Sequence, residues 1–232
     1  MLEKIYTIPV NEAFEAADGC PFCALYKKLE KNELELILGA SMMEPDVRKV
    51  TNKKGFCRDH YHKLHKAQKR LPLALMLESH IAEVEKMLTP SALSFKDRGE
   101  TVASAARTLS DSCYVCERVE FHFAKMLSTA CLLYDQDSDF RRKLKEQPYF
   151  CPEHYARYLE TAKSAMPRRR YTDFVEDIRA VEEGYLKELG ERVSRFCQKF
   201  DYRHAGEPWG DEKNAVEDSL LFFGVDMGEK KK

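Results

Sequence analysis

The chain has 232 residues, of which 33% are charged, with 38 lysines and arginines against 39 aspartates and glutamates. The formal charge of −1 gives no overall positive field, which excludes a protein whose whole surface attracts nucleic acid or anionic lipid. Only 10 glycines and 9 prolines are present. Few helix breakers and many charges favour long amphipathic helices over a turn-rich β-sandwich or barrel, so we expect an all-α fold.

The N-terminal segment and the lengths of the apolar runs indicate the cellular compartment of the protein. Glu3 and Lys4 stand at the start of a segment that holds no apolar run of signal-peptide length. Nowhere does the chain have about 18 consecutive apolar residues, the length that a membrane-spanning helix needs. We therefore expect a cytoplasmic protein that makes no membrane contact. In such a compartment, paired cysteines serve as metal ligands or redox groups more often than as disulfides.

The first half of the chain predicts two long helices joined by a short one. Apolar residues within 21–38 recur at intervals of three, four and seven residues, which is the period of a helix with one buried face. A short connector helix is expected at 45–52. A second long helix then runs from His60 to about residue 88, with a kink or interruption at Pro72. Proline and serine at 90–91 break the pattern.

The second half predicts the same order of elements, followed by a tail. Helices are expected at 115–133, 138–145 and 152–166, and another long one at 175–200. The segment 199–210, dense in aromatic and turn residues, ends that helix before a last short one at about 212–223. We expect this tail to pack Trp209, Leu221 and Phe222 on the bundle. The alternative is that it forms a surface for a partner or ligand.

The chain repeats one pattern of cysteine and histidine. A Cys-x-x-Cys motif at Cys20 is followed after 33 residues by a Cys-x-x-His motif at Cys57, and a second pair with a gap of 34 residues begins at Cys113 and Cys151. Phenylalanine precedes and tyrosine follows both Cys-x-x-His motifs. This self-similarity predicts a tandem duplication. We assign residues 1–95 to the first helical repeat, 96–190 to the second, and 191–232 to a C-terminal extension that packs on the bundle.

Each repeat holds three cysteines and one histidine, which is the Cys₃His ligand set of a structural zinc site. Ligands three residues apart lie about one helical turn apart, so both can face the same side of a helix start, where thiolates are also favoured. Pro152 suits the first position of a helix and places Cys151 at its cap. We therefore predict two zinc ions per chain, each clamping the open ends of one helical hairpin within one bundle. The predicted ligand sets are Cys20, Cys23, Cys57 and His60 for the first ion, and Cys113, Cys116, Cys151 and His154 for the second.

Other interpretations of these residues stay open. The cysteines could form redox dithiols, hold an iron–sulfur cluster with one histidine ligand, or be small buried residues without a ligand. Cys131 and Cys197 lie outside the motifs and are expected to pack as small hydrophobic residues. His62 and His65 could each replace His60 as ligand, but only His60 has a counterpart at the matching position of the second repeat.

No catalytic constellation is recognisable. The chain has no glycine-rich phosphate loop, no His-Glu-x-x-His motif and no nucleophile elbow. We therefore lean against an enzyme, and no cofactor-binding residue is assigned. The basic runs 168–170 and 230–232 are not interleaved with aromatic residues, which argues against nucleic-acid contact.

The chain resembles an uncharacterised bacterial family of unknown function that carries duplicated Cys-x-x-Cys and Phe-Cys-x-x-His motifs. The likeness spans almost the entire chain, and the resemblance implies no established activity. The segments that carry it lie at 43–48, 55–60, 113–118, 150–154, 199–203 and 208–210.

From the sequence we predict a metal-binding helical protein, stabilised by structural zinc, that acts as a scaffold for a protein partner or small ligand. The alternative is a redox or iron–sulfur protein that uses the same quartets for electron transfer or sensing. A weaker alternative is nucleic-acid binding through the Arg168–Arg170 face.

Overall fold

The structure is a computed structural model that describes residues 4–89, 97–204 and 206–225. These residues form α-helices and two short 3-10 helices, and no strand occurs among them. The predicted all-α class is therefore confirmed. Within the described ranges, every helix is too short or too polar to cross a membrane.

The helix boundaries follow the predicted order with additions. The helices of the first half are α1 (Lys4–Ala16), α2 (Pro21–Ile37), η1 (Ala40–Met43), α3 (Pro45–Lys54), α4 (Arg58–Lys66), α5 (Arg70–Leu88) and α6 (Arg98–Asp111). Those of the second half are α7 (Tyr114–Gln136), α8 (Ser138–Lys145), α9 (Pro152–Ala165), α10 (Arg168–Gln198), η2 (Asp211–Asn214) and α11 (Ala215–Phe222). The predicted tail therefore has its break and its short last helix.

Two differences from the predicted helices have local causes. The long helix expected after His60 is divided into α4 and α5, because Gln68 adopts a left-handed φ of 57° that a helix cannot contain. Helices α1 and α6 were not predicted. Within α6 no residue is buried, so the helix has no core-facing residues that would have marked it.

By their packing, the described residues form two compact units. The first unit contains those up to Lys27 and those from Phe123 onward, and the second contains those from Lys28 to His122. The start of α2 and the end of α7 belong to the first unit, and the remainder of both helices belongs to the second. The predicted boundary at residue 95 lies outside the described residues, so the division into 1–95, 96–190 and 191–232 stays a prediction, as does the tandem duplication.

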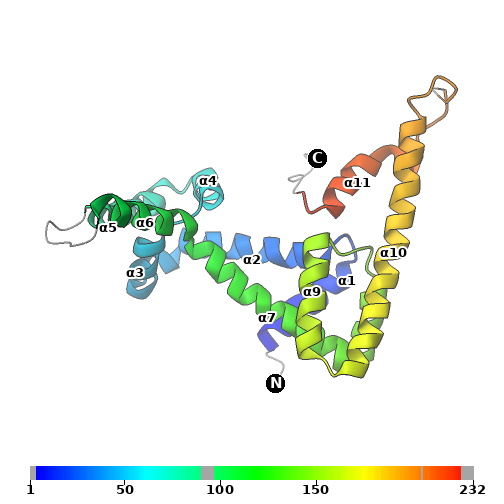
Figure 1. Ribbon diagram of the computed structural model, residues 1–232, viewed down its shortest axis with the longest axis horizontal. Helices are drawn as coiled ribbons and strands as arrows, with labels where there is room; N and C mark the ends of the chain where they lie inside the picture. The colour runs from blue at the N-terminus through cyan, green and yellow to red at the C-terminus, as the bar shows by residue number, and fades with distance from the viewer. Residues whose placement is uncertain (1–3, 90–96, 205, 226–232) are drawn as a thin grey trace. The chain divides into compact units, whose positions relative to one another are not determined.

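The first unit is built around an aromatic core. Tyr158 of α9 lies at its centre, fully buried, with its ring centroid 4.7 Å from that of Phe22 in α2 and 4.8 Å from that of Phe174 in α10. The chain turns back after α10 (Figure 1), so that η2 and α11 both contact α10, and Arg195 of α10 forms an ion pair with Asp211 of η2 at 2.9 Å. These contacts place the start of α9 and the end of α11 in the same unit.

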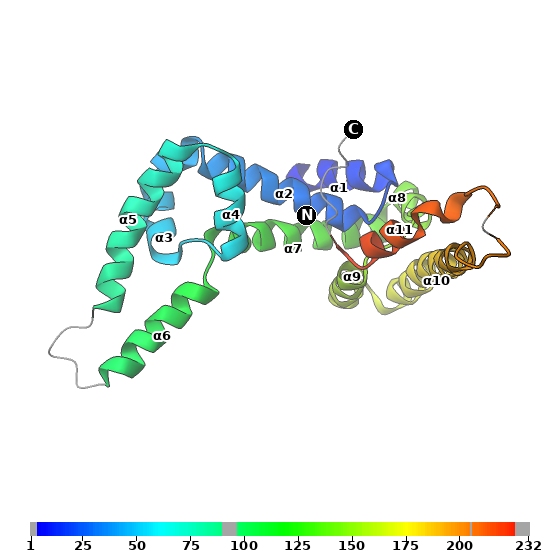
Figure 2. The ribbon, with the colours of Figure 1, turned by 90° about the horizontal axis from the view of Figure 1, so that it is seen from above.

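The second unit is held by α3, which packs on α5. Arg48 of α3 donates from Nη2 to the carbonyl of Leu75 at 2.8 Å and to the hydroxyl of Ser79 at 2.5 Å, so one guanidinium joins the two helices. Helices α5 and α6 lie side by side (Figure 2). This packing brings the start of α7, which follows α6 directly, next to the end of α3: the Tyr114 N–H donates to the Gly55 carbonyl at 3.1 Å.

Candidate metal centres

All four cysteine motifs begin at the N-terminus of a helix. In each, the carbonyl of the first cysteine accepts the first helical hydrogen bond from the N–H four residues on, at 2.8–3.3 Å. Cys57 and Cys151 have the extended backbone of N-cap residues, and Pro152 occupies the first turn of α9 as predicted. The second ligand of each motif is therefore one turn into the helix, on the same side as the first.

The four motifs meet in two clusters, but not in the predicted pairs. One cluster contains Cys20, Cys23, Cys151 and His154, and the other contains Cys57, His60, Cys113 and Cys116. We name them the outer and inner clusters, because the sequence positions of the second lie between those of the first. The predicted sets, in which each repeat closes on itself, were wrong. Each Cys-x-x-Cys motif instead meets the Cys-x-x-His motif of the other half, because the start of α2 packs with α9 and the start of α7 packs with α4.

The spacing of the donor atoms suits one metal ion in each cluster. In the outer cluster, Nδ1 of His154 lies 3.7, 3.3 and 3.1 Å from the sulfurs of Cys20, Cys23 and Cys151. In the inner cluster, Nδ1 of His60 lies 3.1–3.4 Å from its three sulfurs. A tetrahedral zinc ion with its usual bond lengths separates sulfur from nitrogen by about 3.6 Å and sulfur from sulfur by about 3.8 Å. The donor atoms of each cluster, all within 4.8 Å of one another, therefore fit around a single ion.

Burial and hydrogen bonds shift the pKa values of the thiols within the clusters in opposite directions. Burial raises the pKa of Cys20 to about 12, whereas hydrogen bonds from Cys20 and Cys23 lower that of Cys151. In the inner cluster, burial alone would raise the pKa of Cys113, but hydrogen bonds from His60 and its neighbours hold it at about 6. One thiol in each cluster, Cys151 in the outer and Cys113 in the inner, thus has its pKa shifted toward the thiolate form. A divalent cation would stabilise the thiolate form of every cysteine in its cluster, and the helix N-termini around it favour the same negative charge.

A carboxylate supports the histidine of the inner cluster. Oε1 of Glu30, in α2, lies 3.1 Å from Nε2 of His60, and Oε2 of the same carboxylate pairs with Lys63 at 2.5 Å. The hydrogen bond with His60 keeps the pKa of Glu30 below its ordinary value. A carboxylate on the second nitrogen of a ligand histidine fixes its orientation and strengthens metal binding.

The loop that leads into the inner cluster depends on glycine. Gly55 has a left-handed φ of 58°, and a Cβ there would lie 2.4 Å from Nε2 of His80. His80 in turn donates from Nδ1 to the Asn52 carbonyl at 2.7 Å, so its ring cannot easily withdraw. The equivalent position before the outer Cys-x-x-His motif is Tyr149, which stacks on Tyr185 with a centroid distance of 4.5 Å.

Aromatic rings surround the histidine of the outer cluster. The ring centroid of His154 lies 5.1 Å from that of Phe123 and 6.1 Å from that of Phe22. Within the described ranges no hydrogen bond involves Nε2 of His154. Behind Cys151, the buried carboxyl of Glu182 accepts the Phe150 N–H at 2.6 Å, and burial raises the pKa of this carboxyl to about 7.

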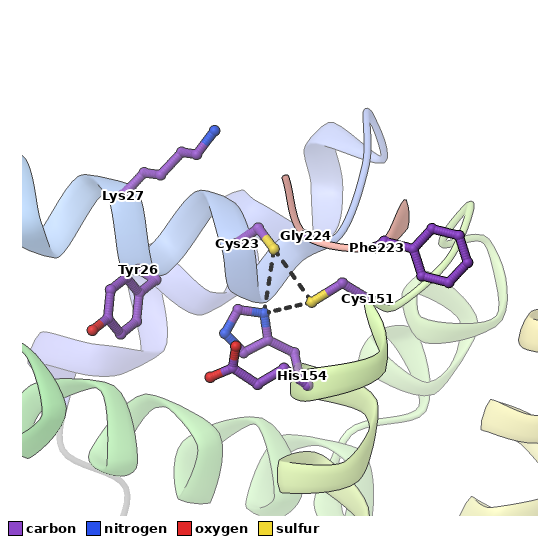
Figure 3. A pocket seen from close by; sticks show the side chains of 8 residues that line it. Cys23, Tyr26, Lys27, Cys151, His154, Phe223 and Gly224 are labelled. Atoms are coloured by element: carbon purple, nitrogen blue, oxygen red, sulfur yellow. Dashed lines mark hydrogen bonds between the residues drawn. The ribbon is translucent and has the colours of Figure 1, made fainter. Parts of the chain in front are cut away.

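A cleft of about 290 Å³ opens onto the outer cluster. Figure 3 shows the side chains of Cys23, Cys151 and His154 converging within it. Tyr26 and Lys27 of α2 and Phe223, just past the end of α11, line the cleft as well. Three of the four donor residues of this cluster are therefore next to a space that a small molecule can enter.

The remaining singled-out residues are placed as follows. His62 and His65 are exposed, and neither joins a cluster. Cys131 is fully buried as predicted, but Cys197 is exposed on α10, so the prediction that it packs in the core was wrong. Phe222 of the tail is buried against Tyr149, as expected of a packed segment, whereas Trp209 is 47% exposed.

Sequence reasoning missed Glu30 as a partner of His60. The signal that could have found it is its position seven residues after Cys23, two helical turns further along the same face of α2. Because the predicted set already placed Cys23 beside His60, Glu30 would have been expected far from that histidine. The crossed pairing reverses this expectation.

The fold and these two clusters define an all-α protein with two candidate Cys₃His metal-binding sites. The chain belongs to a family of unknown function, DUF6062, whose model matches residues 1–230. No curated protein and no solved structure matches the chain.

Proposed function

We propose that this is a cytoplasmic protein in which two zinc ions, one per cluster, hold a helical scaffold for a protein partner or small ligand. The observation that carries the proposal is the convergence of three sulfurs and one imidazole nitrogen within 4.8 Å, twice in one chain. Three thiolates and an imidazole are ligands that zinc prefers, and the two clusters share this composition.

The distances favour one ion per cluster over the other interpretations. Sulfur atoms lie 3.5 Å apart between Cys23 and Cys151 and 3.8 Å apart between Cys57 and Cys116, well beyond the disulfide length of about 2.05 Å. An iron–sulfur cluster binds its protein ligands through separate iron atoms, which requires a wider set than one whose donors surround a single point.

A structural role follows from the number of ligands. Four protein ligands fill the tetrahedron of a zinc ion and leave no position for substrate or activated water. Each ion would join two helix starts that are far apart in sequence, 128–134 residues in the outer cluster and 53–59 in the inner one. Closing such long loops opposes folding, and metal binding supplies the compensating free energy.

Elemental analysis and an absorption spectrum of protein purified without oxygen test the proposal. We expect two zinc ions per chain, no visible absorption, and unfolding when a strong chelator removes the metal. Stable, fully helical protein without metal would contradict it. Brown protein containing iron would instead support the redox alternative.

A further inference from the structure

The two clusters have the same ligands but different surroundings, and the difference lies at one equivalent position. Glu30 is the seventh residue after Cys23, and Phe123 is the seventh residue after Cys116. Each contacts the histidine of the cluster to which its own helix contributes no cysteine: Glu30 bonds to His60 at 3.1 Å, and the Phe123 ring lies 5.1 Å from that of His154. A carboxylate thus supports the inner histidine, and a phenyl ring packs on the outer one.

On this basis we propose that the outer cluster is an exchangeable metal site and the inner cluster a resident one. The protein then changes its content by one zinc ion as the concentration of free zinc varies. This inference rests on the proposed function, because it requires that both clusters hold zinc.

The first argument concerns affinity. Removing a hydrogen-bonded partner from a ligand histidine typically weakens metal binding by about 10–100-fold. His60 has such a partner in Glu30, and Lys63 holds that carboxylate through its other oxygen. His154 lacks one among the described residues. The inner cluster should therefore bind zinc about 10–100-fold more tightly.

The second argument concerns access. One thiol of the outer cluster, Cys23, and two of the inner one, Cys57 and Cys116, are partly exposed, so the exposure of single thiols by itself favours access to the inner cluster. The cleft of about 290 Å³, however, is lined by three donor residues of the outer cluster together. A donor atom of a competing ligand can approach the ion through this space, and zinc tolerates a fifth ligand in passing.

Loss of the outer ion would have a local consequence. It would remove the link between the start of α2 and the start of α9, both in the first unit. The cleft wall at Phe223 belongs to the same unit, and α11 is tied to α10 through the ion pair of Arg192 with Asp218. The second unit keeps its own ion and the Glu30 support, so the change stays within the first unit.

The test is a chelator titration of the full-length, zinc-loaded protein, with EDTA as the probe. Native mass spectrometry counts the zinc ions, and alkylation followed by peptide mapping identifies which cysteines become free. We expect a one-zinc species to accumulate. Its freed cysteines should be Cys20, Cys23 and Cys151, released at a chelator concentration about 10–100-fold below that which frees the inner cysteines.

Simultaneous loss of both ions, or earlier alkylation of Cys57, Cys113 and Cys116, would overturn the inference. The zinc content measured before any chelator is added reports on the proposed function separately. A chain that starts with two ions and loses them together refutes only the unequal exchange.

A variant at the supporting carboxylate makes the test independent of the outer cluster. Glu30→Gln keeps the side-chain size but removes the negative charge beside His60. It should lower the chelator concentration that frees the inner cysteines by about 10-fold or more, toward the concentration that frees the outer ones. The matched control is Glu83→Gln, since Glu83 is a surface residue of the same unit that pairs with Lys86 at 2.8 Å. Equal behaviour of the two variants would show that Glu30 has no positioning role.

Discussion

The outer and inner clusters contain the same four ligand types in the same helix positions, but their histidines have different surroundings. Aromatic rings pack on the histidine of the outer cluster, and charged side chains lie beside the histidine of the inner one. Glu30 with Lys63 surrounds His60, whereas Phe123 with Phe22 surrounds His154. The comparison teaches that the ligand motif fixes only the identity of the donors. In our proposal, the metal affinity of each site and its accessibility to a competing ligand depend on residues two helical turns away and on the cleft beside the outer cluster.

The crossed pairing of the motifs carries the largest expected effect. Cys20→Ser with Cys151→Ser removes two ligands from one cluster, so this double variant should retain one zinc ion. Cys20→Ser with Cys57→Ser removes one ligand from each cluster and should retain none, with loss of the cooperative unfolding transition of both units. Zinc content after dialysis against a weak chelator, with thermal unfolding, measures both.

Cys197→Ser serves as the control for these variants, because Cys197 is exposed and belongs to neither cluster. It should retain two ions. The reverse result, in which the pair at Cys20 and Cys57 keeps one ion and the pair at Cys20 and Cys151 keeps none, would restore the pairing within each half of the chain.

The sequence was sufficient for the local part of each site and insufficient for its assembly. The i, i+3 spacing and Pro152 determine that each motif caps a helix and presents two donors on one side, because these are interactions within a single turn. Which two helix starts meet depends on the tertiary path of α2 and α7. The gaps of 33 and 34 residues accommodate either pairing, so no local signal could distinguish them.

The entry to the inner cluster should be sensitive to a single methyl group. Gly55→Ala places a Cβ against the His80 ring in a left-handed backbone, and the backbone strain alone is expected to destabilise the second unit by about 1–3 kcal/mol. Gly190→Ala is the control, since nothing lies within 4 Å of a Cβ there and the helical position should gain about 0.5–1 kcal/mol. Denaturant unfolding of the two variants measures the contrast. Equal stability would mean that the loop before Cys57 adjusts freely.

Glu182 is buried behind Cys151 of the outer cluster, and its carboxyl should make the stability of the first unit depend on pH. Burial raises its pKa from 4.5 to about 7, so the folded protein favours the protonated carboxyl; this stabilisation is complete below pH 4.5 and is lost as the pH rises through 7. Glu182→Gln keeps an acceptor for the Phe150 N–H and removes that dependence. It should therefore be more stable than the natural chain at pH 8, by about 1–3 kcal/mol.

Glu182→Ala leaves the Phe150 N–H without its acceptor and should lower the free energy of unfolding by about 1–3 kcal/mol at pH 6. Unfolding curves at pH 6 and pH 8 separate the two variants. A glutamine variant as unstable as the alanine variant would show that the ionised carboxylate itself supports the start of α9.

The smallest expected effect lies in the aromatic core beneath the outer cluster. Tyr158 is fully buried, and within the described ranges its hydroxyl has no hydrogen-bond partner, so Tyr158→Phe keeps the ring contacts and removes an unsatisfied polar group. Its free energy of unfolding should rise by about 1 kcal/mol. Tyr134→Phe is the matched control, because the Tyr134 hydroxyl donates to Asp177 at 2.8 Å and its removal should lower stability by about 1 kcal/mol. Opposite signs for the two substitutions would show that Tyr158 stabilises the core through its ring alone, whereas Tyr134 also does so through its hydroxyl. A loss of stability in Tyr158→Phe would show that the Tyr158 hydroxyl has a partner.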